Sequence, residues 1–480
     1  MDIDSFVSVN IDLRVVSAEY PAFDAELFLL DSDAVPIDQR IRVLTKNDGD
    51  DLTDDTVEKD FWTAFFGQTG KKADRLILGR LVRTAIPPAF VCGTVDTTIA
   101  SWAALTDTGT FTVVDSEANS TVVPVDDLTG VTTFAQVIVI LNTSLGNLVA
   151  PDVVGLDTAE FAYDALDRLV LSMPAGQDDT DPTITITYDD TPGTVPYLLG
   201  LTVSGAGTAV TGNAIETLME SYTAVKTKTL AFYNVAIEDR TTDVYTERLA
   251  LAAQIETERR QATFIETESE MVDSAVSTDL QSKLATLDYQ RSLVIYTEHT
   301  TEYPDAAADG KFLPAEPGTR QYGHSPLAGI TASGSIGANN DLSSTHIAAI
   351  EGKGGNYIAR AGGSTFIHRG KTADGIEKRL VMFRDWMEAY MQVDIFNLDM
   401  NEDFVGFDEE TLGAIAGIFE KYLEEGIERK GILSYDLNMP NLDDFTTAQK
   451  TSGDMTLDNV FTAVGRFEAH TFEITGSITV

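Results

Sequence analysis

The chain has one cysteine, Cys92, in 480 residues. An intramolecular disulfide needs two cysteines and a cysteine-based zinc site needs several, so both are excluded within this sequence. Basic residues are also scarce, because 33 Lys and Arg stand against 76 Asp and Glu, for a formal net charge of −43. A surface this acidic repels phosphates, so we expect no direct contact with nucleic acid.

Long apolar runs are missing too. The longest aliphatic stretch lies near residues 137–141, far short of the ~20 apolar residues that cross a bilayer. The first residues, MDIDSFVSV, lack the basic and apolar regions of a secretory signal. We therefore expect no membrane insertion. The 43% hydrophobic content is normal for a chain with a buried core, and the length predicts two or three domains.

The sign of the charge reverses in one window, residues 353–384. It holds only two acidic residues, Asp374 and Glu377, against seven basic ones: Lys353, Arg360, Arg369, Lys371, Lys378, Arg379 and Arg384. A local basic strip on an acidic protein indicates an anionic partner surface, although a solvated helix face is the alternative.

The second half of this basic strip has the periodicity of a helix. Apolar residues recur at helical spacing after Gly375, at Ile376, Leu380, Phe383, Met387 and Met391. The intervening positions are charged: Glu377, Lys378, Arg384, Asp385 and Glu388. The pattern predicts an amphipathic helix with one charged face.

Composition divides the chain into three segments. Residues 91–213 read as an acidic inserted α+β domain, because Arg168 is the only basic residue from 84 to 225 and short strand patterns surround one helix pattern at 132–145. We expect this insertion to face solvent. Residues 1–90 form an N-terminal part of the core, and residues 214–480 form its C-terminal part.

The C-terminal segment alternates strand and helix patterns. Strands are predicted at 229–237, 262–267 and 292–296, with helices at 242–256 and 278–287 between them. This alternation is typical of a mostly parallel sheet covered by helices, so the predicted fold class is α/β, or α+β overall, with a mixed sheet. Residues 299–344 are rich in Gly, Ala and Ser and are predicted to be mainly loop. Asp408 is a candidate cap for a further helix, with Phe407 and Leu412 as a hydrophobic staple.

The two ends of the chain carry strand patterns. Apolar residues alternate with polar ones at Val7, Val9, Ile11, Leu13 and Val15, and again at Phe472, Ile474, Ile478 and Val480. Chain ends usually fray, so two good strands at the extremities suggest that both find sheet partners. Exchange with neighbouring subunits is the favoured interpretation, and closure of the chain's own sheet is the alternative.

The sequence contains no complete motif for catalysis or for binding a metal or nucleotide. The acidic stretch 48–60 lacks the glycine spacing of an EF-hand, so a solvated loop is favoured over a calcium site. Gly370-Lys371-Thr372 has Thr365 where a Walker A loop needs glycine, which favours a structural turn. The five histidines show no metal-ligand spacing, and no serine lies in a nucleophile elbow. We expect no enzyme activity, no cofactor and no metal, and a structural role for Asp385-Trp386 is favoured over a catalytic one.

Four short motifs occur in a recognisable order. They are Gly-Gly-Asn-Tyr at 354–357, Gly-Lys-Thr-Ala-Asp-Gly at 370–375, Asp385-Trp386, and the segment from Gly426 to Gly431-Ile432. This order resembles the C-terminal core of contractile phage tail sheath proteins. The resemblance covers residues 215–480, and 1–90 more loosely.

The resemblance implies a structural subunit that polymerises as stacked six-membered rings around a tail tube and contracts to drive the tube through the host envelope. Its implied partners are other copies of itself, the tail tube protein, and baseplate and tail terminator proteins. It implies a virion component assembled in the host cytoplasm. Five basic residues are candidates to face the tube: Arg369, Lys371, Lys378, Arg379 and Arg384. A non-contractile virion surface or baseplate protein, or an adhesin, is the alternative.

Overall fold

The structure is a computed structural model that describes residues 7–12, 22–36, 39–105, 109–164, 168–174, 183–202, 207–240, 245–335, 342–401, 406, 408–452, 455, 457, 460–465, 471–472 and 474–479. The chain divides into two compact units. Unit 1 comprises residues 1–28, 44–77 and 231–480, and unit 2 comprises residues 29–43 and 78–230. Unit 2 contains the predicted insertion 91–213 and extends beyond it at both ends, so those narrower boundaries stay a prediction.

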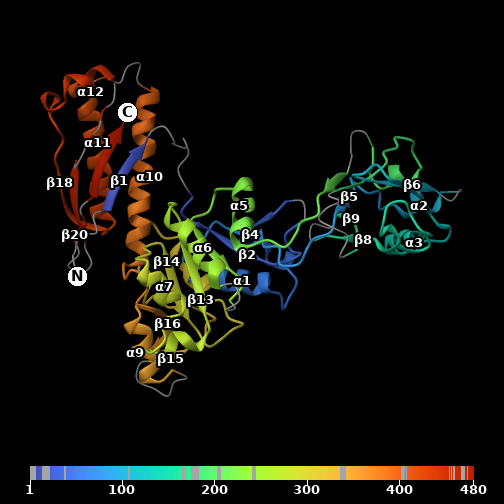
Figure 1. Ribbon diagram of the computed structural model, residues 1–480, viewed down its shortest axis with the longest axis horizontal. Coiled ribbons are helices and arrows are strands. Elements are labelled where there is room, and N and C mark those ends of the chain that lie inside the picture. The colour runs from blue at the N-terminus through green and yellow to red at the C-terminus, as the bar shows by residue number, and fades with distance from the viewer. Residues whose placement is uncertain are drawn as a thin grey trace. The chain divides into compact units, whose positions relative to one another are not determined.

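The largest sheet is mixed, as the sequence predicts. Its main path runs in the order β15-β16-β14-β13-β12-β2-β4-β3, and β17 pairs with β16 off that path (Figure 1). The strands are β2 (Ala25–Leu30), β3 (Ile41–Leu44), β4 (Arg75–Arg80), β12 (Asn234–Ile237), β13 (Gln261–Glu266), β14 (Ser292–Tyr296), β15 (Gly334–Ser335), β16 (Asn356–Ala361) and β17 (Ser364–His368). β12, β13, β14 and β16 pair in parallel, which confirms the predicted parallel part, whereas β16 and β17 form an antiparallel hairpin.

Helices flank this sheet in unit 1: α1 (Val57–Phe66), α6 (Tyr245–Glu256), α7 (Leu280–Thr286), α8 (Pro304–Phe312) and α9 (Ser344–Gly352). α8 lies inside the stretch that was predicted to be loop. Its sequence, PDAAADGKF, lacks an amphipathic pattern because nearly every residue of the helix is buried. Gly310 makes this burial possible, since a Cβ there would lie 2.0 Å from the carbonyl oxygen of Phe65 in α1.

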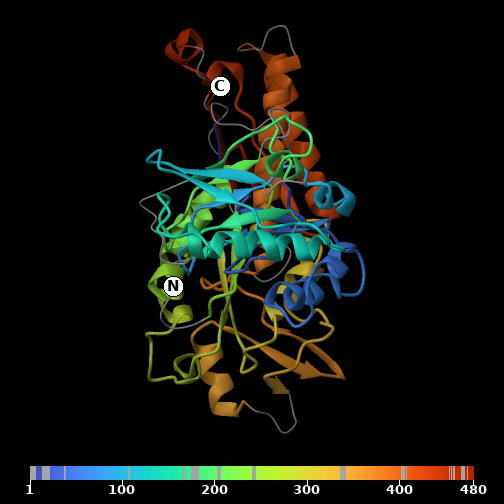
Figure 2. The same ribbon diagram turned by 90° about the vertical axis from the view of Figure 1, so that its right-hand side faces the viewer.

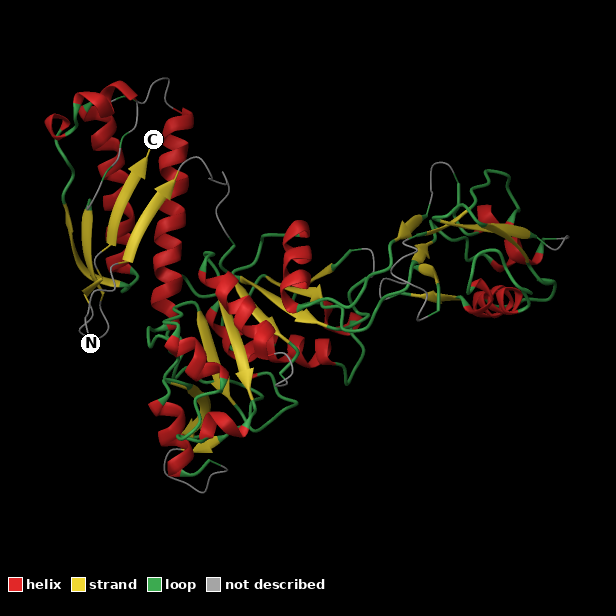
Figure 3. Ribbon diagram, in the orientation of Figure 1, coloured by secondary structure: helices red, strands yellow, loops and turns green. Residues whose placement is uncertain are grey.

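The C-terminal part of unit 1 contains two long helices that lie side by side, α10 (Lys378–Asn401) and α11 (Glu409–Glu428) (Figure 3). Asp408 caps α11 as predicted, because its Oδ1 accepts a 2.7 Å hydrogen bond from the Thr411 amide. Phe407, the other half of the predicted staple, lies outside the described residues. β18 (Ile432–Leu437), α12 (Thr447–Ser452), β19 (Phe461–Gly465) and β20 (Thr471–Phe472) follow, and β18-β19-β20 form an antiparallel sheet.

Unit 2 has two antiparallel sheets of its own. One is ordered β11-β5-β9-β8 and the other β10-β6-β7. Their strands are β5 (Ala89–Val91), β6 (Thr110–Asp115), β7 (Ser120–Pro124), β8 (Glu160–Tyr163), β9 (Leu169–Ser172), β10 (Ile184–Ile186) and β11 (Thr208–Val210), and the helices are α2 (Ile99–Ala103), α3 (Phe134–Gly146), α4 (Val195–Leu198) and α5 (Leu218–Lys228). α3 confirms the predicted helix at 132–145, and Figure 2 shows it lying along the strands.

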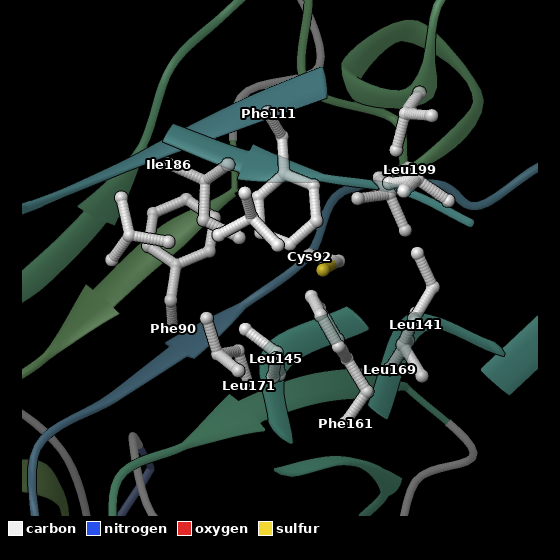
Figure 4. Close-up of a cluster of buried hydrophobic side chains, with 14 of the residues drawn as sticks. Phe90, Cys92, Phe111, Leu141, Leu145, Phe161, Leu169, Leu171, Ile186 and Leu199 are labelled. Atoms are coloured by element: carbon white, nitrogen blue, oxygen red, sulfur yellow. The ribbon is translucent and has the colours of Figure 1, made fainter. Parts of the chain in front are cut away.

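A hydrophobic core fills unit 2. Phe90, Phe111 and Phe161 lie around the Cys92 thiol (Figure 4), which is 5% exposed. Burial raises the pKa of this thiol to about 12, so it is neutral and unreactive at physiological pH. The residues predicted to form an insertion therefore have their own apolar interior.

Candidate functional site

The first two sequence motifs meet through one buried side chain. Asn356, the last residue of the Gly-Gly-Asn turn, donates from Nδ2 to the carbonyl oxygens of Lys371 (2.8 Å) and Val294 (2.9 Å). Its Oδ1 accepts a 2.9 Å hydrogen bond from the Lys371 amide. The amide group therefore joins the start of β16 to the Gly-Lys-Thr turn and to β14, and a buried, fully satisfied amide fixes their positions. Gly370 itself has φ 70°, which supports the predicted structural turn.

The last motif forms a pocket for Phe383 of α10. A Cβ at Gly318, Gly426 or Gly431 would come within 2.7–2.9 Å of the Phe383 ring. The Gly-x-x-x-x-Gly spacing, from Gly426 in the last turn of α11 to Gly431 after it, thus provides room for an aromatic side chain from α10. The sequence gives no sign that the Phe383 ring is the partner of these glycines, because that contact joins residues far apart in the chain.

Asp385 and Trp386 have the structural roles that the sequence favoured. Asp385 is fully buried and accepts hydrogen bonds from Arg291 (2.5 and 2.8 Å) and from the Tyr233 hydroxyl (2.8 Å). Trp386 is 2% exposed, packs against Phe383, and lies 4.2 Å from the guanidinium of Arg429. The Asp-Trp pair therefore holds α10 to the main sheet on one side and to α11 on the other.

The prediction that α10 presents a charged face to solvent or a partner is wrong for its first turn, which is buried. Lys378 is 1% exposed and Arg379 is 2% exposed. The Lys378 ammonium donates to Asp309 Oδ1 (2.7 Å) and Thr263 Oγ1 (2.5 Å), and Arg379 is paired with Glu377. Both side chains are buried within this chain and have partners there, which leaves them little surface for a contact with a tube.

Lys378 belongs to a polar network inside unit 1. Asn234 Nδ2 donates to Asp309 Oδ2 at 3.0 Å and to Glu26 Oε1 at 3.1 Å. Burial, followed by the charges of Asp309 and Asp305, raises the pKa of Glu26 well above its ordinary value. The network joins β2, β12, β13, α8 and α10, so it fixes their mutual register at the cost of desolvating several charges.

The three remaining basic candidates lie in different surroundings. Arg369 is partly exposed, has φ 75°, and donates from Nη1 to the carbonyl oxygen of Glu351 at 2.8 Å. Lys371 is also partly exposed. The Arg384 side chain is 17% exposed and donates to Gln290 at 3.0 Å. Arg369 and Lys371 thus remain candidates for contact with a partner.

The terminal strands pair with each other. β1 (Val7–Asp12) and β21 (Ile474–Thr479) form a parallel two-stranded sheet in the register Val7↔Ile474 to Asp12↔Thr479. Figure 1 shows them side by side, and β1 lies next to α10. Phe472 lies in β20. Leu13, Val15 and Val480 are outside the described residues. Pairing within one chain does not test exchange between chains.

Sequence spacing also missed a pair of histidines. The rings of His324 and His368 lie 5.4 Å apart, and Glu351 Oε1 is 3.5 Å from His368 Nδ1. Burial lowers the pKa of His368 below its ordinary value.

No group of three or more His, Cys, Asp or Glu side chains suited to a metal ion occurs among the residues described. Within the described part of the chain, no helix is both long enough and apolar enough to cross a bilayer.

Comparison with known proteins places sheath tail proteins among the similar solved structures. The crystal structure of a sheath tail protein from Desulfitobacterium hafniense matches with a TM-score of 0.48 and 11% identity, over 97% of this chain and 98% of that chain. A sheath tail protein from Listeria innocua matches with a TM-score of 0.48 and 10% identity, over 97% of each chain. A chain of the anti-feeding prophage baseplate matches at 0.37 and 14%, over 55% of this chain and 75% of its own. No family model and no curated protein matches the sequence.

Proposed function

We propose that this chain is the structural subunit of a contractile tail sheath. The observation that carries the proposal is the separate two-stranded sheet formed by β1 and β21, the first and last strands described. An isolated pair of strands is marginally stable in water, so both strands gain by joining a sheet that neighbouring subunits supply. The four motifs support the proposal, since Asn356, Phe383 and Asp385 connect them into one folded core next to these strands.

In this proposal, copies of the chain form six-membered rings that stack around a tail tube. Exchanged strands keep neighbouring subunits linked, while weaker contacts between the bodies of the subunits rearrange. The energy of contraction is the difference in interface free energy between an extended and a contracted lattice, so the motion requires no cofactor and no catalytic step.

The partners are then other copies of the chain, the tail tube protein, and baseplate and tail terminator proteins. Arg369 and Lys371 are proposed to contact such a partner, because both are basic and partly exposed. The acidic residues 91–213 are proposed to face outward. The protein would be part of a virion and assemble in the host cytoplasm.

The alternative is a non-contractile virion surface, baseplate or adhesive protein. Unit 2 favours this alternative in one respect, because it has an interior of its own and would serve as a binding head.

Negative-stain microscopy of the purified chain distinguishes the two functions. A sheath subunit forms tubular polymers, and an adhesin forms discrete particles. Tubes that appear at high protein concentration without any other component would support the sheath, whereas discrete particles under all conditions would exclude it.

A further inference from the structure

An open hollow in unit 1 gathers basic side chains. It encloses about 690 Å³ and is lined by three basic side chains, Lys71, Arg320 and Arg379, by the carboxylate of Glu316, and by other residues of the segment that follows α8. Lys72 is the sequence neighbour of Lys71, and Arg320 donates from Nη1 to the carbonyl oxygen of Lys311 at 2.7 Å. We call this surface, with Lys71, Lys72, Lys311 and Arg320, the cationic hollow.

Four of these cations lack a carboxylate partner. Lys72 donates to the carbonyl oxygens of Phe66 and Gln68, and Lys311 donates to that of Pro326. Within the described part of the chain, none of Lys71, Lys72, Lys311 and Arg320 takes part in an ion pair. The lining of the hollow has three cations against one carboxylate, Glu316, so its net charge is positive in a chain that has 76 acidic residues.

The pKa of Lys311 agrees with this geometry. It is lowered from its ordinary value, first by burial and then by the charge of Arg320. The Arg320 guanidinium is therefore close enough to Lys311 for the two positive charges to repel each other. A bound anionic group would relieve that repulsion.

The same unit also carries a complementary surface. Residues 48–55 precede α1 and contain Asp50, Asp51, Asp54 and Asp55, all of which are exposed. Asp54 lies 3.7 Å from Lys59, whereas the other three make no ion pair within the part of the chain that is described. We call this segment the acidic turn. Its glycine spacing does not fit a calcium loop, and no group of three or more His, Cys, Asp or Glu side chains suited to a metal ion occurs among the described residues.

The two surfaces flank one helix. The acidic turn leads into the N-terminus of α1, and Lys72 holds the carbonyl oxygen of its last residue, Phe66 (Figure 1 labels α1). α1 has 10 residues, or about 15 Å, so the two surfaces are separate and cannot neutralise each other within a chain. The charges also complement the dipole of α1, which is the purely structural explanation.

We propose that the cationic hollow of one copy of this chain binds the acidic turn of a second copy. This inference rests on the proposed sheath function and identifies one contact within it. Because the cationic hollow and the acidic turn lie at different places on one subunit, the contact between them is heterologous. Such contacts propagate into rings or helical arrays, as a sheath requires, rather than closing a two-fold dimer. Charge steering also overcomes the repulsion between copies that each carry a formal charge of −43.

A charge-swap experiment on the full chain tests the contact. The hollow variant is Lys71→Glu with Arg320→Glu, and the turn variant is Asp50→Lys with Asp51→Lys. A control with the same charge change as the hollow variant is Lys228→Glu with Lys450→Glu, since both lysines are exposed and lie in unrelated elements. Self-association is measured by sedimentation velocity from low to high salt, and folding by thermal melting.

At low salt we expect the hollow variant to self-associate about tenfold more weakly than the control, and the turn variant about tenfold more weakly than the unaltered chain. Each variant reverses two charges at a screened contact, and the turn variant does so although it lowers the net negative charge. The chain that carries all four substitutions should recover association. Lys71→Glu alone, at an exposed side chain, should give a smaller loss in the same direction and guards against misfolding of the double variant.

The outcomes separate the two proposals. If the hollow and turn variants associate as strongly as the proteins they are compared with, the contact is excluded. An earlier melting temperature with unchanged association would show that these charges only stabilise α1. Tubes that form normally from the hollow variant would keep the sheath and exclude the contact. Small oligomers that depend on Lys71 but never become tubes would support the contact and exclude the sheath. A chain that stays monomeric at every salt concentration excludes both.

Discussion

Arg291 and Asp385 form a bidentate ion pair across 94 positions of sequence, with Nη1–Oδ2 and Nη2–Oδ1 distances of 2.5 and 2.8 Å. Asp385 is fully buried and Arg291 is nearly so. The pair joins the residue before β14 to the N-terminal half of α10, and the Tyr233 hydroxyl adds a third contact from the residue before β12. The Asp-Trp motif is therefore the point where the C-terminal helices are held to the main sheet.

Asp385→Asn should destabilise unit 1 by about 3–5 kcal/mol, because it leaves the buried Arg291 guanidinium without its counter-charge. Asp443→Asn is the matched control, since Asp443 is exposed and lies in a turn. Thermal melting followed by circular dichroism measures the difference. A Tm for Asp385→Asn equal to that of the control would show that the pair contributes nothing to stability.

Gly310→Ala should destabilise by at least about 2–3 kcal/mol, because the new Cβ overlaps the backbone of Phe65 and α8 must move away from α1. Gly413→Ala in α11 is the informative control. Nothing lies within 4 Å of a Cβ at Gly413, so alanine there should stabilise the helix by about 0.5–1 kcal/mol. Melting temperatures that move in the same direction for both variants would contradict this explanation.

Local features of the fold could be predicted from the sequence, whereas contacts between distant residues could not. Periodicity and caps are local signals, so the parallel strands, the helix α3 and the Asp408 cap were predictable. The partners of charged residues are not local. Lys378 was assigned to a solvated or tube-facing helix face because its partner, Asp309, is 69 positions away in a helix that the sequence did not predict. That helix was missed because all its sides are buried.

Glu266 should make the stability of unit 1 depend on pH. Burial raises its pKa from an ordinary 4.5 to about 7; Arg248 opposes the shift, and Asp279 and Glu268 reinforce it. Because the folded pKa exceeds the unfolded one, the stabilising contribution is complete below about pH 4.5 and is lost as the pH rises through 7.

The loss is on the order of 2–3 kcal/mol. Glu266→Gln should therefore flatten the pH dependence of the Tm between pH 5 and 8, relative to the unaltered chain, and stabilise it most at pH 8. Parallel pH profiles for the two proteins would mean that the Glu266 carboxyl is ionised in the folded chain.

Removal of the acidic insertion should leave assembly largely intact if it faces outward. The best points at which to cut the chain are Ile86 and Asn213, because their backbones exchange two 2.8 Å hydrogen bonds. β5 belongs to the sheet of unit 2, so a cut after β5 would leave Phe90 and Val91 exposed. A chain with Ile86 joined to Asn213 through two glycines should still form tubes. A folded deletion variant that forms none would make the insertion part of the lattice.

The terminal strands give the most direct test of exchange between subunits. Asn10 and Ser477 are register partners in the parallel β1–β21 pair, and paired strands lie about 4.8 Å apart, within the Cα distance that a disulfide spans. Cys92 is buried and is the only native cysteine, so the double variant Asn10→Cys, Ser477→Cys reports on this pair alone.

Oxidation of the assembled double variant should produce a ladder of covalent multimers on a denaturing gel if β1 of one copy pairs with β21 of another. Pairing within a chain instead produces a monomer of altered mobility. Asn10→Cys alone is the control and should give no ladder. Removal of residues 471–480 provides the complementary measurement. With exchange, the shortened chain stays soluble, melts close to the full chain and fails to polymerise, because the strand served its neighbours. With self-closure, the shortened monomer melts earlier or aggregates, since β1 loses its pairing with β21 within its own chain.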